Sequence, residues 1–304
     1  MKITIVTSRG NKHICDIEAE TTSTVLQLKK SFEKKNKKYY VDRQRFTTST
    51  LGADGKPVAL TDDGKTLSHY NIKSDTTLLF KDLGPQISWT LVFLVEYAGP
   101  LCIYPLFYIF SKQIYGTDFQ KSYVQDLALI CYSLHYIKRL LETIFVHRFS
   151  HGTMPLSNLF KNCTYYWGCT IMVSYFVNHA LYTAPSSINV FVGLVLFAVS
   201  EFLNLMCHIQ LRNLRPPGST ERRIPKGGLF DLVSCPNYTA EITAWIGFSI
   251  MTQTLTAFIF TLLGAFQMYV WAVAKHRRYR KEFDGQNGNP LYPRNRKIIV
   301  PFLL

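Results

Sequence analysis

Hydrophobic and polar positions divide the chain into a polar first part and an apolar second part. Up to about residue 82 apolar residues alternate with Lys, Thr and Asp, whereas from 87 to 274 long apolar stretches recur with short polar interruptions. Crossing the hydrocarbon core of a bilayer takes about 20 mostly apolar residues in a row. The pattern predicts an N-terminal domain over 1–82 and a membrane-embedded domain over 83–304.

The first part has the alternation that is typical of β-strands. Residues 2–7 and 13–20 alternate on either side of a turn at 9–11, which predicts a hairpin. Further strands are expected near 45–46 and at 76–80. A helix is expected between the hairpin and the strand near 45–46, with Thr24 as its cap. Its apolar face is formed by Val25, Leu28 and Phe32, and its polar face by Lys29, Lys30, Lys34 and Lys35.

This order of elements, with a turn-rich stretch at 52–64, resembles ubiquitin-like β-grasp domains. Such domains need no catalytic residues, and the first part offers none. We therefore expect it to bind or recruit partners rather than to carry out chemistry.

The second part predicts an α-helical multi-pass bundle of about six to seven spans. The last two apolar stretches run together, which leaves the number open by one. An even number, a basic C-terminal flank and a start without a signal-peptide core predict that both termini face the cytosol. The expected spans lie near 87–110, 123–146, 165–183, 188–211, 239–254 and 255–274.

Charge supports the membrane interpretation. The formal net charge of +14 could indicate nucleic-acid binding, but the basic residues gather at the ends of spans, as on cytoplasmic flanks. We therefore expect no nucleic-acid partner. The seven cysteines form no CxxC pair and lie mostly in apolar segments, so we interpret them as small buried hydrophobic residues.

Two spans carry polar stripes that a bilayer would not tolerate on its lipid-facing side. His135, Lys138, Arg139 and Glu142 recur at three or four residues along the second span. Each charge inside a span costs about 2.5–3.5 kcal/mol, so a cluster indicates a cavity lined by protein. The alternative is a Lys138–Glu142 ion pair that contributes only packing specificity.

The fourth span carries a second stripe, formed by Glu201, Asn204, His208, Arg212 and Arg215. Hydrogen-bonding groups that end in two arginines suit a ligand with a carboxamide at one end and phosphates at the other, as in a nicotinamide dinucleotide. A snorkelling helix end would explain the arginines but not the deeper Glu201 and Asn204.

Other motifs limit the chemistry. No GxGxxG or GxxxxGK[ST] occurs, so a nucleotide would have to bind within the helical bundle. His147 and His151 have metal-ligand spacing, but no third ligand accompanies them, and we expect no metal. Glu96 lies in the first span beside Gly99 and Pro100, where a kink is expected, and is weak evidence for a site by itself.

Residues 211–245 contain the elements LRxPG, IPxGGLF and VSxxNYxxE in this order, and they resemble the C-terminal signature of the steroid 5α-reductase superfamily. The stretches 81–100 and 135–156 and the ubiquitin-like front narrow the resemblance to the trans-2-enoyl-CoA reductases of very-long-chain fatty-acid elongation. The resemblance covers nearly the whole chain.

The resemblance implies NADPH as cofactor, an acyl-CoA substrate, an endoplasmic reticulum membrane location and other elongation enzymes as partners. It places the essential positions of that family on Gln86, Glu96, Lys138, Arg139, Glu142 and Tyr238. Cofactor contacts of the superfamily fall on Asn204, Arg212, Arg215, Asn237 and Arg277. His208 is expected beside them, although steroid reductases carry an acidic residue at its position.

For the reaction, we expect Tyr238 to protonate the substrate or to hydrogen-bond its enolate. Lys138 or Arg139 would ease the loss of that proton, Glu142 would hold the cation, and Glu241 would orient Tyr238. Three alternatives stay open: a Tyr238 that only anchors its span, a 3-oxo-steroid 5α-reductase, and a non-catalytic membrane scaffold.

Overall fold

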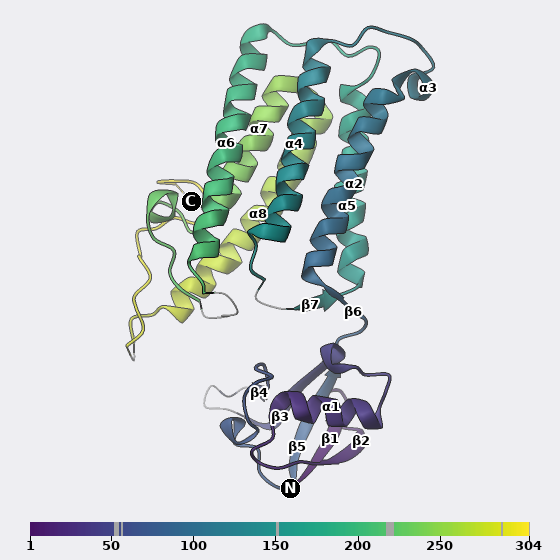
Figure 1. Cartoon of the computed structure of the whole chain (residues 1–304). Coiled ribbons are helices and arrows are strands. Elements are labelled where there is room, and N and C mark those ends of the chain that lie inside the picture. Colours follow the sequence, from purple (N-terminus) through teal and green to yellow (C-terminus); the bar gives the residue numbers. More distant parts are fainter. Residues whose placement is uncertain (52–54, 56, 150–151, 217–221, 287, 304) are drawn as a thin grey trace. The chain divides into compact units, whose positions relative to one another are not determined.

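The computed structural model describes the 304 residues of the chain except 52–54, 56, 150–151, 217–221, 287 and 304. It divides into two compact units (Figure 1). The first unit is made of Met1–Trp89 and His151–Asn158, and the second of Thr90–Ser150 and Leu159–Leu304.

The first unit holds a five-stranded sheet in the order β2-β1-β5-β3-β4, with β1 and β5 parallel and the other pairs antiparallel. Its elements are β1 (Lys2–Thr7), β2 (His13–Glu18), α1 (Val25–Lys35), η1 (Val41–Arg43), β3 (Gln44–Leu51), β4 (Pro57–Ala59), η2 (Ser68–Tyr70) and β5 (Thr76–Asp82). The predicted hairpin and the predicted strands near 45–46 and at 76–80 are confirmed.

Helix α1 begins where the sequence predicts. Thr24 accepts a hydrogen bond from the backbone of Gln27, whose side chain in turn accepts one from the Thr24 backbone. Val25, Leu28 and Phe32 are buried on one face, where they join the core of the sheet. A core of its own allows this domain to fold independently of the helices that follow.

Three short strands differ from the prediction. Pro57–Ala59 forms β4 within the stretch expected to be rich in turns, of which 52–54 and 56 lie outside the described residues. β6 (Gln86–Ser88) pairs with β7 (Thr153–Pro155) in a separate antiparallel ladder. Strands of three residues are too short to set up an alternating pattern, so the sequence does not reveal them.

The second unit is a helical bundle in which α2, α4, α5, α6, α7 and α8 run side by side (Figure 1). Its helices are α2 (Trp89–Ile109), α3 (Ser111–Tyr115), α4 (Tyr123–Phe145), α5 (Ser157–Val177), α6 (Ser187–Asn213), η3 (Gly228–Asp231), α7 (Pro236–Thr252) and α8 (Leu255–Glu282). Aromatic rings fill the core, among them Tyr104, Tyr132, Tyr136 and Phe248, which are fully buried.

The observed helices correct the predicted bounds of one span. Helix α5 begins at Ser157 rather than near 165 and ends at Val177 rather than near 183. The predicted division between the last two spans near 254–255 is confirmed, because Gln253 adopts a left-handed conformation with φ 45° that ends α7 before α8 begins.

Three of the described helices, α2, α6 and α8, are long and apolar enough to cross a bilayer. They identify the chain as a membrane protein. Helix α4 carries the charged stripe and α7 has 17 residues, so the number of spans stays a prediction.

Helices α6 and α7 pack with their backbones in close contact. A Cβ atom added at Gly193 would lie 2.6 Å from the carbonyl oxygen of Gly247, and one added at Gly247 would lie 2.6 Å from the backbone nitrogen of Phe197. Two glycines are needed for this approach. The packing fixes the register between the polar residues of α6 and the first turns of α7.

Candidate active site

Glu201 of α6 joins the two polar stripes inside the bundle. One carboxylate oxygen lies 2.8 Å from His135 Nδ1 of α4, and the other lies 2.8 Å from Lys138 Nζ. Lys138 also donates to Asn204 Oδ1 of α6 at 2.6 Å, whereas its distance to Glu142 is 3.7 Å. The main partners of Lys138 therefore lie on α6, and the Lys138–Glu142 ion pair, the alternative interpretation of this stripe, is the weaker contact.

Asn204 connects these charges to α7. Its amide nitrogen donates to the backbone oxygen of Asn237 at 2.9 Å and to Glu241 Oε2 at 3.0 Å. Glu241 also lies 3.4 Å from His135 Nε2. Among the described residues the polar partners of Glu241 are thus Asn204 and His135, not the Tyr238 hydroxyl that we expected it to orient.

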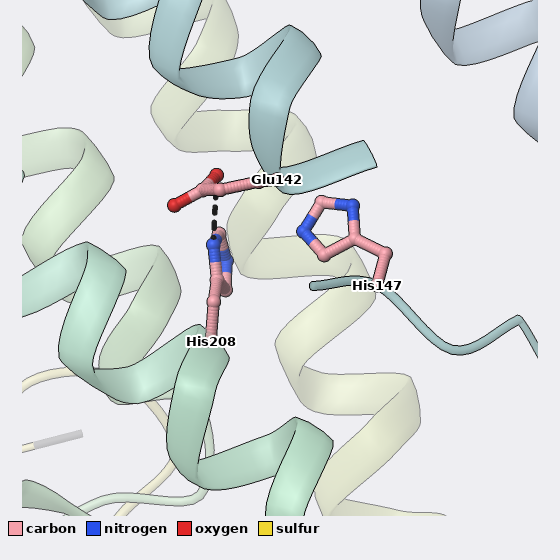
Figure 2. Close-up of side chains that lie close together, drawn as sticks. All are labelled: Glu142, His147 and His208. Carbon is pink, nitrogen blue, oxygen red and sulfur yellow. Dashed lines mark ion pairs between the residues drawn. The ribbon is translucent and has the colours of Figure 1, made fainter. Parts of the chain in front are cut away.

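Arg139 and Glu142 form the second half of the cluster. Arg139 lies 2.7 Å from Glu142 and 3.0 Å from the Tyr97 hydroxyl of α2. Glu142 also lies 3.0 Å from His208 Nδ1 of α6. Figure 2 shows the Glu142–His208 pair, with the His147 ring facing the space beside it. Burial and the nearby Arg139 lower the pKa of His147 to about 3, so its ring is neutral at physiological pH.

Glu142, His147 and His208 bring three possible metal ligands within 4.8 Å of one another. The same carboxylate is held by Arg139 at 2.7 Å and approached by Lys138 at 3.7 Å. These two cations would compete with a metal for the carboxylate and repel it. We therefore assign Glu142 to the ion-pair cluster. His151, the other histidine of the predicted spacing, lies outside the described residues.

A cleft of about 460 Å³ opens where α4, α6, α7 and α8 converge. Its wall is rich in cations and aromatic rings, which suits a ligand that carries both phosphates and planar rings. The basic lining residues are Arg148, Arg212, Arg215, Arg222, Lys275 and Arg278. His147, His208, Tyr238, Trp271 and Tyr279 also line it.

Four predicted site residues, His208, Arg212, Arg215 and Tyr238, meet in this cleft. Arg277 is exposed and does not line it. The reason is helical spacing, since the lining residues of α8 lie three, four, seven and eight positions after Trp271, on a face that excludes 277. The cleft takes Lys275 and Arg278 instead, which the same spacing from Trp271 could have identified.

Tyr238 is half-buried in the first turn of α7, and Lys275 lies over its ring at 6.0 Å from the centroid. Lys138 and Arg139, which we expected beside Tyr238, are engaged with the carboxylates and with Asn204. The cation that accompanies Tyr238 is thus Lys275.

Glu96 and Gln86 belong to different units, and Glu96 interacts with Tyr97 and Arg139 of the cluster. Glu96 is buried in α2 and accepts a hydrogen bond from Asn162 of α5 at 2.8 Å. Gln86 belongs to the first unit, where its amide nitrogen donates to the backbone oxygens of Leu83 and Gly84. A role in catalysis stays a prediction for both.

Comparison with known proteins identifies the family. Residues 152–304 match the family described as 3-oxo-5-alpha-steroid 4-dehydrogenase, and residues 1–82 match the family described as TECR, ubiquitin-like domain. The chain is 57% identical over 305 residues to the very-long-chain enoyl-CoA reductase of Dictyostelium discoideum, with 99% of each chain covered. The chain belongs to the very-long-chain enoyl-CoA reductase family. It is also 48% identical to the probable very-long-chain enoyl-CoA reductase art-1 of Caenorhabditis elegans, over 93% of this chain and 92% of the relative.

Membership in a family of enoyl-CoA reductases and steroid dehydrogenases indicates a nicotinamide cofactor. The residues in and beside the cleft fit such a group. Its arginines offer donors for phosphates, and the side-chain oxygen of Asn237, a buried residue next to Tyr238, has no hydrogen-bond partner among the described residues. A buried polar atom of this kind is stabilised by a ligand that donates to it.

Proposed function

We propose that this membrane enzyme reduces the 2,3-double bond of a very-long-chain trans-2-enoyl-CoA with NADPH, as the last step of the fatty-acid elongation cycle. The observation that carries the proposal is a basic cleft with Tyr238 in its wall, in a chain whose relatives over its full length are named very-long-chain enoyl-CoA reductases. The cofactor supplies the hydride that reaches C3 of the substrate.

Residues in the cleft wall and beside it would hold different parts of the cofactor. Arg212 and Arg215, at the end of α6, would bind its phosphates, together with Arg278 of α8. Asn237 would accept a hydrogen bond from the carboxamide through its unpartnered oxygen, while Asn204 holds the backbone of Asn237 in place. His208 would contribute from the cleft wall, where Glu142 fixes its ring.

Tyr238 is the proposed proton donor to C2, or the hydrogen-bond donor to the enolate oxygen of the thioester. Charge that develops on its oxygen is stabilised by the ammonium group of Lys275 on the neighbouring helix. This assigns to Lys275 the part that the sequence had suggested for Lys138 or Arg139.

The ion-pair cluster has a positioning role in this scheme. Lys138, Glu201 and Asn204 link α4 to α6, and Asn204 continues to the first turn of α7. Glu142 and Arg139 link the same helix to His208 and Tyr97. Because buried ion pairs add little net stability, we attribute these charges to the placement of Tyr238, Asn237 and His208.

The decisive test is consumption of NADPH by the purified protein with a long-chain trans-2-enoyl-CoA, with the saturated acyl-CoA of equal length as control. We expect turnover with the first and none with the second. The family description also names a steroid reaction, so a 3-oxo-4-ene steroid is the second substrate to compare. A higher kcat/KM on the steroid would transfer the assignment to a 3-oxo-steroid 5α-reductase.

The remaining proposals concern placement in the cell. We propose a ubiquitin-like domain over 1–82 and a catalytic domain of about six spans over 83–304, in the endoplasmic reticulum membrane with both termini cytosolic. The N-terminal domain would recruit other enzymes of the elongation cycle. Protease protection of tags at each terminus in sealed microsomes tests the orientation.

A further inference from the structure

The loop that leads into α7 carries two parts of the proposed site. It brings Arg222 to the cleft, continues through η3, and ends at Asn237 and Tyr238 in the first turn of α7. Loops of this length have little regular hydrogen bonding of their own. Something else must therefore hold the described part of the loop, 222–235, against the cleft.

The C-terminal segment Tyr292–Ile299 holds this loop by backbone pairing. The backbone of Ser234 donates to Lys297 at 2.8 Å and that of Cys235 donates to Ile298 at 3.2 Å. Lys297 returns a hydrogen bond to Leu232 at 3.0 Å, which completes a short parallel bridge. Figure 1 shows the yellow C-terminal segment running beside the green segment between α6 and α7.

Ser234 adds a buried side-chain junction to this pairing. Its hydroxyl lies 2.6 Å from His276 Nδ1 of α8 and 2.7 Å from the Tyr292 hydroxyl, and it donates to the Lys297 backbone oxygen at 3.1 Å. The Ser234 residue is 1% exposed. The loop, the C-terminal segment and α8 are thus joined at one point, three residues before Asn237.

Arg296 is the unexpected residue in the segment, because it is a charged residue that is only 4% exposed. It donates to the Pro225 backbone oxygen at 2.9 Å, lies 5.1 Å from the Tyr292 ring centroid and is 3.7 Å from the largely exposed Asp231. Its Nε has no partner among the described residues. Burying a charge with such incomplete pairing is costly, so stability does not account for an arginine here.

The same segment supports the cleft wall by packing. The Tyr292 ring stacks on Tyr279, a cleft-lining residue of α8, at 5.3 Å between centroids. Ile299 packs with Cys235 and Ala272 in a small core against which Tyr238 rests. Movement of the segment would therefore displace both Tyr279 and Tyr238.

We propose that Tyr292–Ile299 is a strap that positions the loop and the first turn of α7, with Arg296 as its principal positioning residue. This rests on the proposed function of the cleft. Arg296 acts through Pro225 on the part of the loop that bears Arg222, while Lys297–Ile299 act on the residues directly before Tyr238. Displacement of reacting groups by about 1 Å can cost up to about 100-fold in rate.

The test is the variant Arg296→Gln in the full-length protein in detergent. The matched control is Arg294→Gln, which removes the same charge from an exposed arginine two residues earlier. We expect Arg296→Gln to raise the KM for NADPH and to lower kcat/KM by at least about tenfold. Arg294→Gln should change neither, and Arg296→Lys should recover part of the loss because its ammonium can donate to Pro225.

Cys235 supplies a readout that does not depend on activity. It is fully buried beside Ile299, so its alkylation, followed by mass spectrometry of its peptide, reports release of the strap. We expect alkylation to be at least about tenfold faster in Arg296→Gln than in Arg294→Gln, with the unfolding midpoint of the two within a few degrees.

The two readouts separate the possible failures. Unchanged protection of Cys235 together with unchanged KM in Arg296→Gln would overturn the strap. A large fall in the unfolding midpoint, with the KM of the folded fraction unchanged, would also overturn it and leave a merely structural role. Faster alkylation without any effect on NADPH binding would retain the strap but refute the assignment of the cleft to the cofactor.

Discussion

Tyr238 is the proposed proton donor, and it lies in the cleft wall with the Lys275 ammonium over its ring. Tyr238→Phe removes one hydroxyl and keeps the packing against Cys235 and Ile299. We expect kcat to fall by at least about 100-fold, the usual effect of losing a general acid, with NADPH binding nearly unchanged. Stopped-flow kinetics measures kcat, and a fluorescence titration measures NADPH binding. Tyr269→Phe, at a partly exposed tyrosine of α8, is the control, and turnover of Tyr238→Phe within threefold of wild type would contradict the role.

Arg215 is the proposed contact for the 2′-phosphate that distinguishes NADPH from NADH. Because an arginine–phosphate contact is worth about 1.5–3 kcal/mol, Arg215→Ala should weaken NADPH by roughly 10- to 100-fold and NADH much less. Isothermal titration with both cofactors measures this. Equal losses of affinity for NADPH and NADH would mean that Arg215 contacts the pyrophosphate instead.

Arg277→Ala is the matched variant for Arg215, since Arg277 is exposed and does not line the cleft. Its cofactor affinities should stay within about twofold of wild type. A loss of NADPH affinity as large as that of Arg215→Ala would support Arg277 as the cofactor contact that the family resemblance implies.

Residue identities were easier to predict than residue partners. The spacing of His135, Lys138 and Glu142 along one helix is visible in the sequence, and the structure places them on a common side. That Lys138 turns to Glu201 and Asn204 depends on how α4 meets α6, which no spacing within one helix encodes. Hence the polar cluster was predictable and its pairing was not.

At the scale of elements, the contact between α6 and α7 depends on two glycines. Gly247→Ala would place a Cβ 2.6 Å from backbone atoms of α6, and a helix backbone cannot yield as a flexible side chain can. We expect a loss of at least about 1–3 kcal/mol in the free energy of unfolding, with reduced activity because Asn204 would lose its contacts to α7.

The control for this contact is Gly168→Ala in α5, where no described residue lies within 4 Å of the added Cβ. Removing a flexible glycine from a helix should raise stability there by about 0.5–1 kcal/mol. Unfolding midpoints of both variants in the same detergent test the opposite signs. A stable, active Gly247→Ala would mean that the two helices can separate without disturbing the site.

Elements with a long periodic pattern were predictable and short ones were not. The capping box at Thr24 and the buried face of α1 follow from the sequence alone. The strap at 292–299 escaped prediction, because its pairing partner at 232–235 is distant in sequence and neither segment alternates. The packed helices form the cleft, and these irregular segments complete its wall.

At the scale of the whole molecule, function and membrane insertion make opposite demands on α4. The polar cluster needs charges inside the bundle, whereas a span needs an apolar surface, and α4 meets both by turning Ile130, Leu134 and Ile137 outward. Because charged residues lower its mean hydropathy, α4 is not among the described helices that are long and apolar enough to cross a bilayer, which are α2, α6 and α8. Composition therefore identifies the membrane protein, while the part that α4 takes in crossing the bilayer stays a prediction.

The last prediction concerns the N-terminal domain. Deletion of residues 1–80 removes the sheet with its own core but keeps Gln86–Ser88 and their pairing with Thr153–Pro155. Every residue of the proposed cleft lies beyond the deletion. We expect the truncated protein in detergent to keep NADPH-dependent turnover within about twofold, because domains with separate cores rarely depend on each other for local geometry. The domain would then serve recruitment.

A monodisperse truncation that binds NADPH but cannot reduce enoyl-CoA would instead give the domain a part in holding the substrate. In that case the exposed Lys30 and Lys34 are the first candidates to meet the CoA phosphates, and the charge reversals Lys30→Glu and Lys34→Glu in the full chain should raise the KM for the acyl-CoA without changing that for NADPH.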